Sequence, residues 1–222
     1  SVIQMAQQVN PLGLQTHIQR VSTALKRDGK YKLLRLVDGT QLHVFCPTET
    51  PDGHGCGLLQ NLATFASVRV GAPLKFVENA VLSLKKPKGM RKGAQIIRPF
   101  TNLLDLNGGT LVFVNSDPIG VTDDPLAFVK VARAARRSLV LPFDCSIVRA
   151  DHGICVSSDM GVVVFPLIHL ESMSKFNEAI EAARTSGEEL WAAMCRLGIV
   201  EYVDHQDRED HHDERQLEGT RE

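Results

Sequence analysis

Residues 46–61, CPTETPDGHGCGLLQN, gather the side chains of this sequence whose types could do chemistry. Two cysteines, a histidine and two acidic residues lie within the stretch, separated by prolines and glycines. Three interpretations compete: a metal clip, a thiol active site, or a rigid loop that positions something else. Each demands a different spacing.

The metal and thiol interpretations rest on the residues His43, Cys46, His54 and Cys56, in the pattern H-x2-C-x7-H-x-C. Structural zinc sites use S and N ligands that usually come in two short-spaced pairs, and this pattern lacks them. A reactive thiol needs a base in an electropositive niche. A cysteine that only packs in the interior as a small apolar side chain needs neither of these. A free-standing zinc- or thiol-dependent protein built on these four residues is therefore the alternative hypothesis.

The rigid-loop interpretation explains more of the stretch. Thr50-Pro51-Asp52-Gly53 suits a type I turn, with proline at its second position and glycine at its fourth. A helix is expected to begin at Leu58. A loop stiffened in this way would hold the carboxylate of Glu49 at a fixed place. The structural residues that we assign to it are Pro47, Pro51, Gly53 and Gly57.

Composition bounds the class of protein. The 222 residues are 43% hydrophobic and 23% charged, as in an ordinary globular protein. The formal net charge of −1 argues against a protein that binds nucleic acid over its whole surface. The five cysteines are odd in number and form no CxxC, which favours reduced thiols. No apolar run approaches the roughly 20 residues that cross a bilayer, so no membrane partner is expected. The chain starts without methionine, inside an expected helix, and we expect a piece of a longer chain.

Periodicity predicts an α+β fold. Strong local signals are a buried strand over 110–115 and a helix that begins after Asp123-Asp124-Pro125, with aspartate as N-cap. Weaker signals predict the remaining elements: two short helices in 1–22, a β-hairpin at the Asp38-Gly39 pair of 34–45, strands in 146–170, helices in 174–197 broken near Gly187, and a last strand at 199–204.

The stretch CPTETPDGHGCGLLQNLA resembles the C-P-x-E-T-P-E-G-x-x-C-G-L-x-x-N-L signature of the second-largest (beta-type) subunit of multisubunit DNA-directed RNA polymerases. Upstream, NPLGLQTHIQRVSTALKRDGK resembles the fork segment of that subunit. Downstream, VFVNSDPIGV, GVVVFPLIHL and GIVEYVDHQDRED resemble its external regions, in the family's order. The mixture of polymerase I-like and polymerase II-like features suggests a divergent eukaryotic or viral lineage.

The resemblance implies four segments along the chain. A mixed fork module of helices plus a β-hairpin is expected at 1–85, and a β-rich external 1-like module with flanking helices at 86–170. A helical segment and last strand follow at 171–203, where external 2 would start. The acidic tail 204–222 carries dense charge and is expected to be disordered.

The resemblance also implies functional roles. Arg20, on the fork helix, would lie beside the RNA–DNA hybrid. The basic turn of Lys26, Arg27 and Lys30 would contact phosphates at the downstream edge of the bubble, and Glu49 would lie near the active centre.

No catalytic residue and no metal ligand are expected in this chain, because the Mg²⁺ ions of the whole polymerase would be held elsewhere, and the chain alone is expected to be inactive. The expected partners are the largest polymerase subunit, other polymerase subunits, template DNA and the hybrid. The expected location is the nucleus, or a viral or host-cell site of transcription.

Overall fold

The chain divides into two compact units, Ser1–Ser67 (unit 1) and Val68–Glu222 (unit 2). The computed structural model describes residues 3–6, 8–26, 28–85, 97–99 and 109–210. The division at 67/68 lies ahead of the module boundary expected at 85/86, and the basic stretch 86–93 lies outside the described residues.

Unit 1 is built from short elements. Helix α1 (Pro11–Ile18) begins at Asn10, whose side chain accepts a hydrogen bond from the Gly13 amide, and proline occupies the first turn. Strand β1 (Arg20–Ser22) follows and pairs antiparallel with β2 (Leu59–Asn61). Of the two helices expected in 1–22, the described residues contain one.

Two local predictions for unit 1 were wrong. The Asp38-Gly39 pair closes no β-hairpin, because the Asp38 carboxylate accepts from the Thr40 amide at 2.9 Å and caps a short 3₁₀ turn. Between residues 33 and 41 the chain forms two 3₁₀ turns, η1 (Leu33–Arg35) and η2 (Gly39–Gln41). The helix expected from Leu58 is instead strand β2, whose partner β1 lies far away in sequence.

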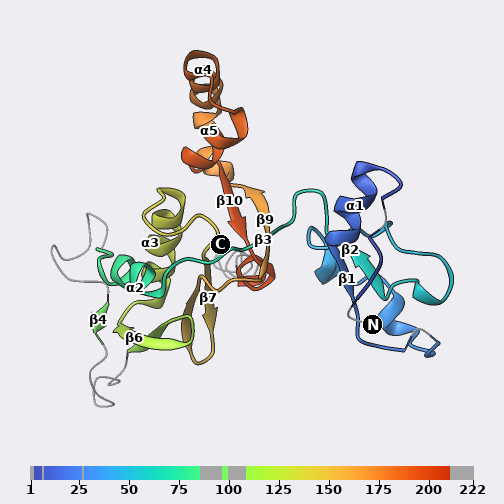
Figure 1. The fold of residues 1–222 in the computed structure, drawn as a ribbon. Coiled ribbons are helices and arrows are strands. Elements are labelled where there is room, and N and C mark those ends of the chain that lie inside the picture. The colour runs from blue at the N-terminus through green and yellow to red at the C-terminus, as the bar shows by residue number, and fades with distance from the viewer. Residues whose placement is uncertain (1–2, 7, 27, 86–96, 100–108, 211–222) are drawn as a thin grey trace, which may run out of the picture. The chain divides into compact units, whose positions relative to one another are not determined.

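Unit 2 contains a five-stranded sheet in the order β4-β6-β5-β8-β7, of which Figure 1 labels β4, β6 and β7. Strands β5 and β8 run parallel and the other neighbours antiparallel. The strands are β4 (Arg98–Pro99), β5 (Thr110–Val114), β6 (Asp117–Thr122), β7 (Ser146–Ala150) and β8 (Gly153–Ser157). The predicted strand over 110–115 is confirmed, as are the first strands within 146–170.

Helices α2 (Leu74–Leu82) and α3 (Pro125–Arg137) complete the core of this sheet. The Asp124 carboxylate accepts from the Ala127 amide at 3.0 Å, so the predicted N-cap is confirmed. The apolar face of α3 is buried in one cluster with α2 and the sheet; its members are Phe128, Val129, Ala132 and Ala135.

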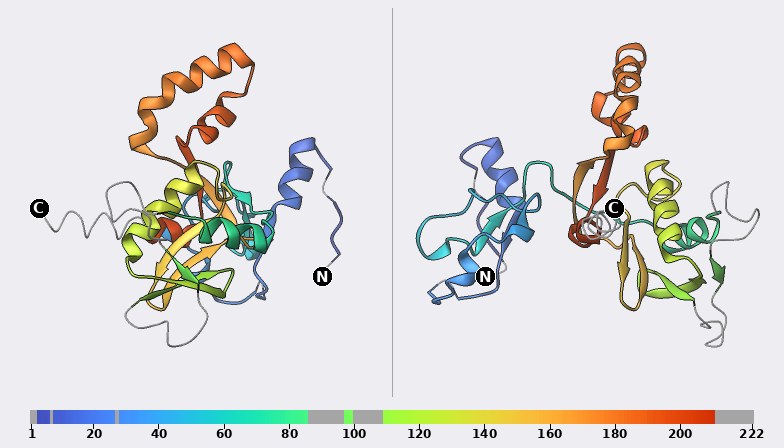
Figure 2. Two further views of the ribbon diagram at one scale, coloured as in Figure 1. Left: turned by 90° about the vertical axis from the view of Figure 1, so that its left-hand side faces the viewer. Right: turned by 180° about the vertical axis from the view of Figure 1, so that it is seen from behind.

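A second sheet in the order β10-β9-β3 carries a helical hairpin, which we call the arm (Figure 2). Its strands are β3 (Ser67–Val68), β9 (Val163–Ile168) and β10 (Val200–Val203). The arm comprises η5 (Leu170–Lys175), α4 (Phe176–Ser186) and α5 (Leu190–Arg196). The predicted helix break is confirmed, because Gly187 ends α4 in the left-handed region at φ 68°.

The start of the acidic tail is ordered, contrary to the prediction for 204–222. Residues 205–210 are helical, and the Asp204 carboxylate caps them by accepting from the Asp207 amide at 2.9 Å. Asp204 and Asp210 are 7% exposed and Asp207 is fully buried. Arginines more than 50 positions away in sequence neutralise these carboxylates, and a local composition argument could not include them. The rest of the predicted tail, 211–222, lies outside the described residues.

None of the helices in the described ranges is both long enough and apolar enough to span a membrane.

Candidate nucleic-acid interface

The stretch 46–61 forms a loop closed by side-chain hydrogen bonds. The Thr50 hydroxyl accepts from the Gly57 amide at 2.9 Å and donates to the Leu59 carbonyl at 3.0 Å. The predicted type I turn over 50–53 is wrong, because Asp52 is extended at ψ 157°. The turn comes later, as η3 (Gly53–Gly55), where the Cys56 amide donates to the Gly53 carbonyl at 3.1 Å.

Two glycines give this loop its path. Gly53 and Gly57 lie in the left-handed region, at φ 77° and 73°. A Cβ at Gly57 would stand 2.5 Å from the Arg35 carbonyl oxygen, whereas a Cβ at Gly53 would meet open space. Gly57 is therefore required both for its backbone angle and for the close approach of residue 35.

Arg35 ties this loop to the basic turn. Its Nη1 donates to the carbonyls of His54 at 2.9 Å and Cys56 at 2.8 Å. Its Nη2 donates to the Gly29 carbonyl at 3.2 Å. One planar guanidinium thus bridges two segments, since its donors point in fixed directions. Arg35 was not predicted from the sequence, because an arginine among leucines shows no local pattern.

The basic turn contains two lysines within the described residues. Lys26 and Lys30 are exposed, and the Gly29 amide donates to the Lys26 carbonyl at 3.1 Å to close the turn. Arg27, predicted to act with them, lies outside the described residues. Hydrogen bonds to the Gly29 and Lys26 carbonyls already fix the backbone of this turn. Exposed ammonium groups on it can therefore contact phosphates without a large further loss of backbone entropy.

Arg20 and Glu49 are linked through Asn61. Arg20 was predicted to lie on a helix, but α1 ends at Ile18 and Arg20 begins strand β1. Arg20 is in register with Asn61 of β2, and the Asn61 side chain donates to the Glu49 carbonyl at 3.1 Å. The Glu49 side chain is exposed, and its carboxylate accepts no hydrogen bond from the residues that the structure describes. The carboxylate therefore remains available on an anchored backbone.

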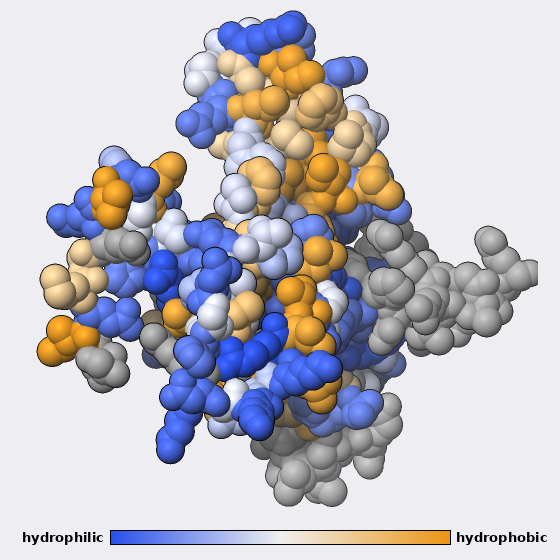
Figure 3. Space-filling model, turned by 90° about the vertical axis from the view of Figure 1, so that its right-hand side faces the viewer, coloured by the Kyte–Doolittle hydropathy of each residue, from blue (hydrophilic) through white to orange (hydrophobic). Residues whose placement is uncertain are grey.

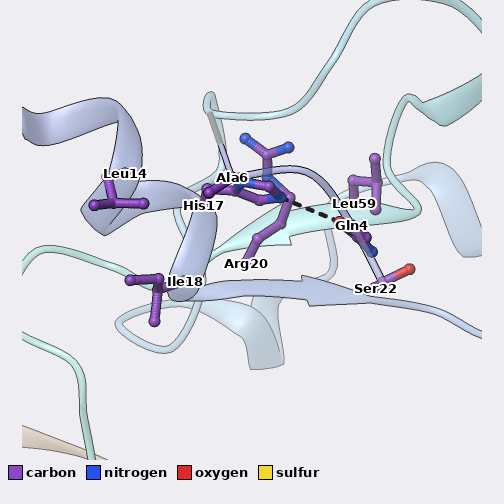
Figure 4. A pocket seen from close by; sticks show the side chains of 8 residues that line it. All are labelled: Gln4, Ala6, Leu14, His17, Ile18, Arg20, Ser22 and Leu59. Atoms are coloured by element: carbon purple, nitrogen blue, oxygen red, sulfur yellow. Dashed lines mark hydrogen bonds between the residues drawn. The ribbon is translucent and has the colours of Figure 1, made fainter. Parts of the chain in front are cut away.

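A cavity of about 500 Å³ lies beside Arg20 (Figure 4). His17 and Gln4 share a hydrogen bond of 3.1 Å at this cavity. The Arg20 Nε is buried and has no hydrogen-bond partner within the described chain. The cavity is lined by Gln4, Ala6, Leu14, His17, Ile18, Arg20, Ser22 and Leu59.

The cysteine and histidine side chains of the loop do not converge. Across the described ranges, no group of three or more His, Cys, Asp or Glu side chains is placed to hold a metal ion. The zinc hypothesis on His43, Cys46, His54 and Cys56 therefore finds no support. A hydrogen bond from the Thr48 hydroxyl lowers the pKa of the Cys46 thiol, but that pair contains no general base.

Comparison with known proteins bears on this arrangement. The family model described as RNA polymerase Rpb2, domain 3, matches residues 4–68, and that of Rpb2, domain 4, matches residues 112–171. The chain belongs to the family of RNA polymerase second-largest subunits. The predicted resemblance is thereby confirmed, and the domain 3 match contains the basic turn, Arg35 and the whole 46–61 loop.

Individual members of the second-largest-subunit family align over most of the chain. The DNA-directed RNA polymerase II subunit RPB2 of Encephalitozoon cuniculi is 28% identical over 211 residues, covering 94% of this chain and 18% of the relative. That of Schizosaccharomyces pombe is 28% identical, covering 87% and 17%. The archaeal subunit Rpo2 of Sulfolobus acidocaldarius is 26% identical, covering 94% and 19%. The chain thus spans less than a fifth of the length of these relatives.

Proposed function

We propose that this chain works as part of the second-largest subunit of a DNA-directed RNA polymerase, where it helps to form the active-centre cleft and to position template DNA and the RNA–DNA hybrid. The observation that carries the proposal is the Arg35 bridge. It fixes an exposed basic turn to a stiff loop within the segment that matches the family's domain 3. Cations on an anchored turn suit phosphate contacts that read no sequence.

The proposed division of labour follows from the side chains present. Lys26, Arg27 and Lys30 contact phosphates near the downstream edge of the bubble, and Arg20 lies beside the hybrid. Glu49 presents a carboxylate toward the active centre. Nucleotidyl transfer needs two metal ions held by carboxylates, which we place in other parts of the whole polymerase. The chain alone is therefore inactive as a nucleotidyltransferase.

The proposed partners are the largest subunit and other subunits of the polymerase, together with DNA and RNA. The RPB2 relatives are subunits of eukaryotic polymerase II, which supports a nuclear site of action. A viral or host-cell transcription site is the second proposal for location, and it rests on the mixed polymerase I-like and II-like sequence alone. With a formal net charge of −1, the isolated chain binds nucleic acid weakly and in a salt-sensitive way.

Charge reversal tests the role of the basic turn. Lys26→Glu, Arg27→Glu and Lys30→Glu are combined in the assembled polymerase, and elongation rate and complex lifetime are measured against salt concentration. We expect slower elongation, and a salt-dependence slope that falls by about 0.9 for each duplex phosphate that the turn no longer neutralises.

The matched control carries the same change of charge on exposed lysines of unit 2, as Lys75→Glu, Lys85→Glu and Lys175→Glu. It should transcribe like the parent enzyme. Equal transcription by the parent and the basic-turn variant would remove the proposed role of the turn.

A further inference from the structure

Many of the buried apolar residues of unit 2 belong to two clusters that share no member, whereas Val121, Val164, Phe165 and Val203 are buried outside both. One cluster joins α2, α3 and the five-stranded sheet, which together we call the body. The other lies within the arm and its supporting strand β10, around Ala179, Ala193 and Ile199. The arm also exposes apolar side chains along its length, including Leu170, Leu190 and Trp191 (Figure 3).

A buried charged group connects the two clusters. Arg136 of α3 is 1% exposed, and its Nη2 lies 3.0 Å from the Glu201 carboxylate of β10. Its Nη1 pairs with Asp207 and donates to the Cys145 carbonyl at 2.8 Å. Helix α3 supplies core residues to the body, and β10 supplies core residues to the arm cluster. Arg136 therefore links an element of one cluster to an element of the other.

The short helix after β10 extends the connection. Asp207 also pairs with Arg133 of α3 at 3.2 Å, and Asp210 pairs with Arg133 at 2.7 Å. Asp204 pairs with Arg69 and accepts from the Ser146 hydroxyl of β7. We call this set the joint; its members are Arg69, Arg133, Arg136, Glu201, Asp204, Asp207 and Asp210.

Such a set of charges acts differently from apolar packing. Burying ions costs desolvation energy that pairing roughly offsets, so a buried ion pair is weak evidence for stability. The joint is not fully satisfied either, because the buried Nε atoms of Arg69 and Arg136 have no hydrogen-bond partner within the described chain. Its bonds are directional, however, whereas apolar contact is not. Directional bonds between two separate cores select one relative orientation.

We propose that the joint sets the orientation of the arm on the body of unit 2, so that the arm is held at one angle by buried charges. The two apolar clusters stabilise their own parts, and the joint adds the geometric restraint between them. This inference does not depend on the proposed function of unit 1.

A distance measurement between arm and body tests the joint. Spin-labelled non-natural amino acids replace Asn177 on α4 and Ala134 on α3, both exposed, in the full chain. Pulsed electron resonance should give one narrow distance distribution. The charge-balanced variant Arg136→Met/Asp207→Asn leaves Glu201 with Arg137 at 3.4 Å and Arg133 with Asp210. This variant should unfold cooperatively yet lose the single narrow peak, which broadens or splits.

A second variant covers the case in which the first does not fold. Glu201→Met keeps the Arg136–Asp207 pair and removes only the link from α3 to β10. It too should broaden the distribution. The control Arg196→Met/Glu188→Gln removes an exposed pair of 2.9 Å inside the arm and should leave the peak unchanged. A folded variant of the joint with the narrow peak of the parent chain overturns the proposal, as does a parent chain with a broad distribution.

Discussion

Removal of the Asp207 carboxylate perturbs a fully buried set of ion pairs in unit 2. In Asp207→Ala, Arg136 keeps Glu201 at 3.0 Å and Arg133 keeps Asp210 at 2.7 Å, so neither guanidinium is left without a carboxylate. Breaking a buried pair on one side costs about 3–5 kcal/mol, and the remaining partners favour the lower end. We therefore expect a loss of about 3 kcal/mol, or a decrease in Tm of roughly 6–12 °C for a unit of this size.

The assay is urea unfolding followed by the fluorescence of Trp191, the one tryptophan of the sequence, which lies on α5 in unit 2. The double variant Arg136→Met/Asp207→Asn removes charge of both signs and should be less destabilised than Asp207→Ala, since no excess buried charge remains. The exposed-pair variant Glu188→Gln should be much less destabilised than Asp207→Ala, because solvent and salt screen the Glu188–Arg196 pair. If Asp207→Ala costs no more than Glu188→Gln, the acidic segment is not docked as described.

Three further predictions concern the loop and a buried thiol. In the 46–61 loop, amide hydrogen exchange should accelerate most for Gly57→Ala, which combines a left-handed φ with a clash, less for Gly53→Ala, and not for Gly39→Ala, which meets open space. Arg35→Met should raise exchange in both the loop and the basic turn without changing α3, and protection retained in both would refute the bridge. Burial raises the pKa of the Cys145 thiol to about 12, so the neutral thiol is favoured on folding and this contribution to stability declines as the pH rises from 9.0 toward 12. Iodoacetamide near neutral pH should therefore modify the exposed thiol of Cys56 in unit 1 and leave Cys145 unmodified until urea unfolds the chain.

The sequence predicted unit 2 better than unit 1 for physical reasons. Asp124 before a proline and Gly187 after a helix are local start and stop signals, and both act as predicted. Strand β2 pairs with residues 20–22 across a long loop, so no local pattern distinguished it from a helix start.

The prediction of disorder for the acidic segment failed for a related reason, because the order of residues 204–210 depends on ion pairs with arginines of α3. The Asp204-x-x-Asp207 spacing, similar to a capping box, was the available local signal. At the candidate site, the sequence identified the loop glycines but not Arg35, whose role exists only in the folded chain.

The most direct test of the proposed function is photo-crosslinking from position 30 in an assembled polymerase halted on a bubble template. A photoreactive residue at Lys30 should crosslink to DNA near the downstream edge of the bubble, and one at Asn177 on the arm should not. Equal crosslinking from both positions, or none to nucleic acid from position 30, would contradict the proposed role of the basic turn.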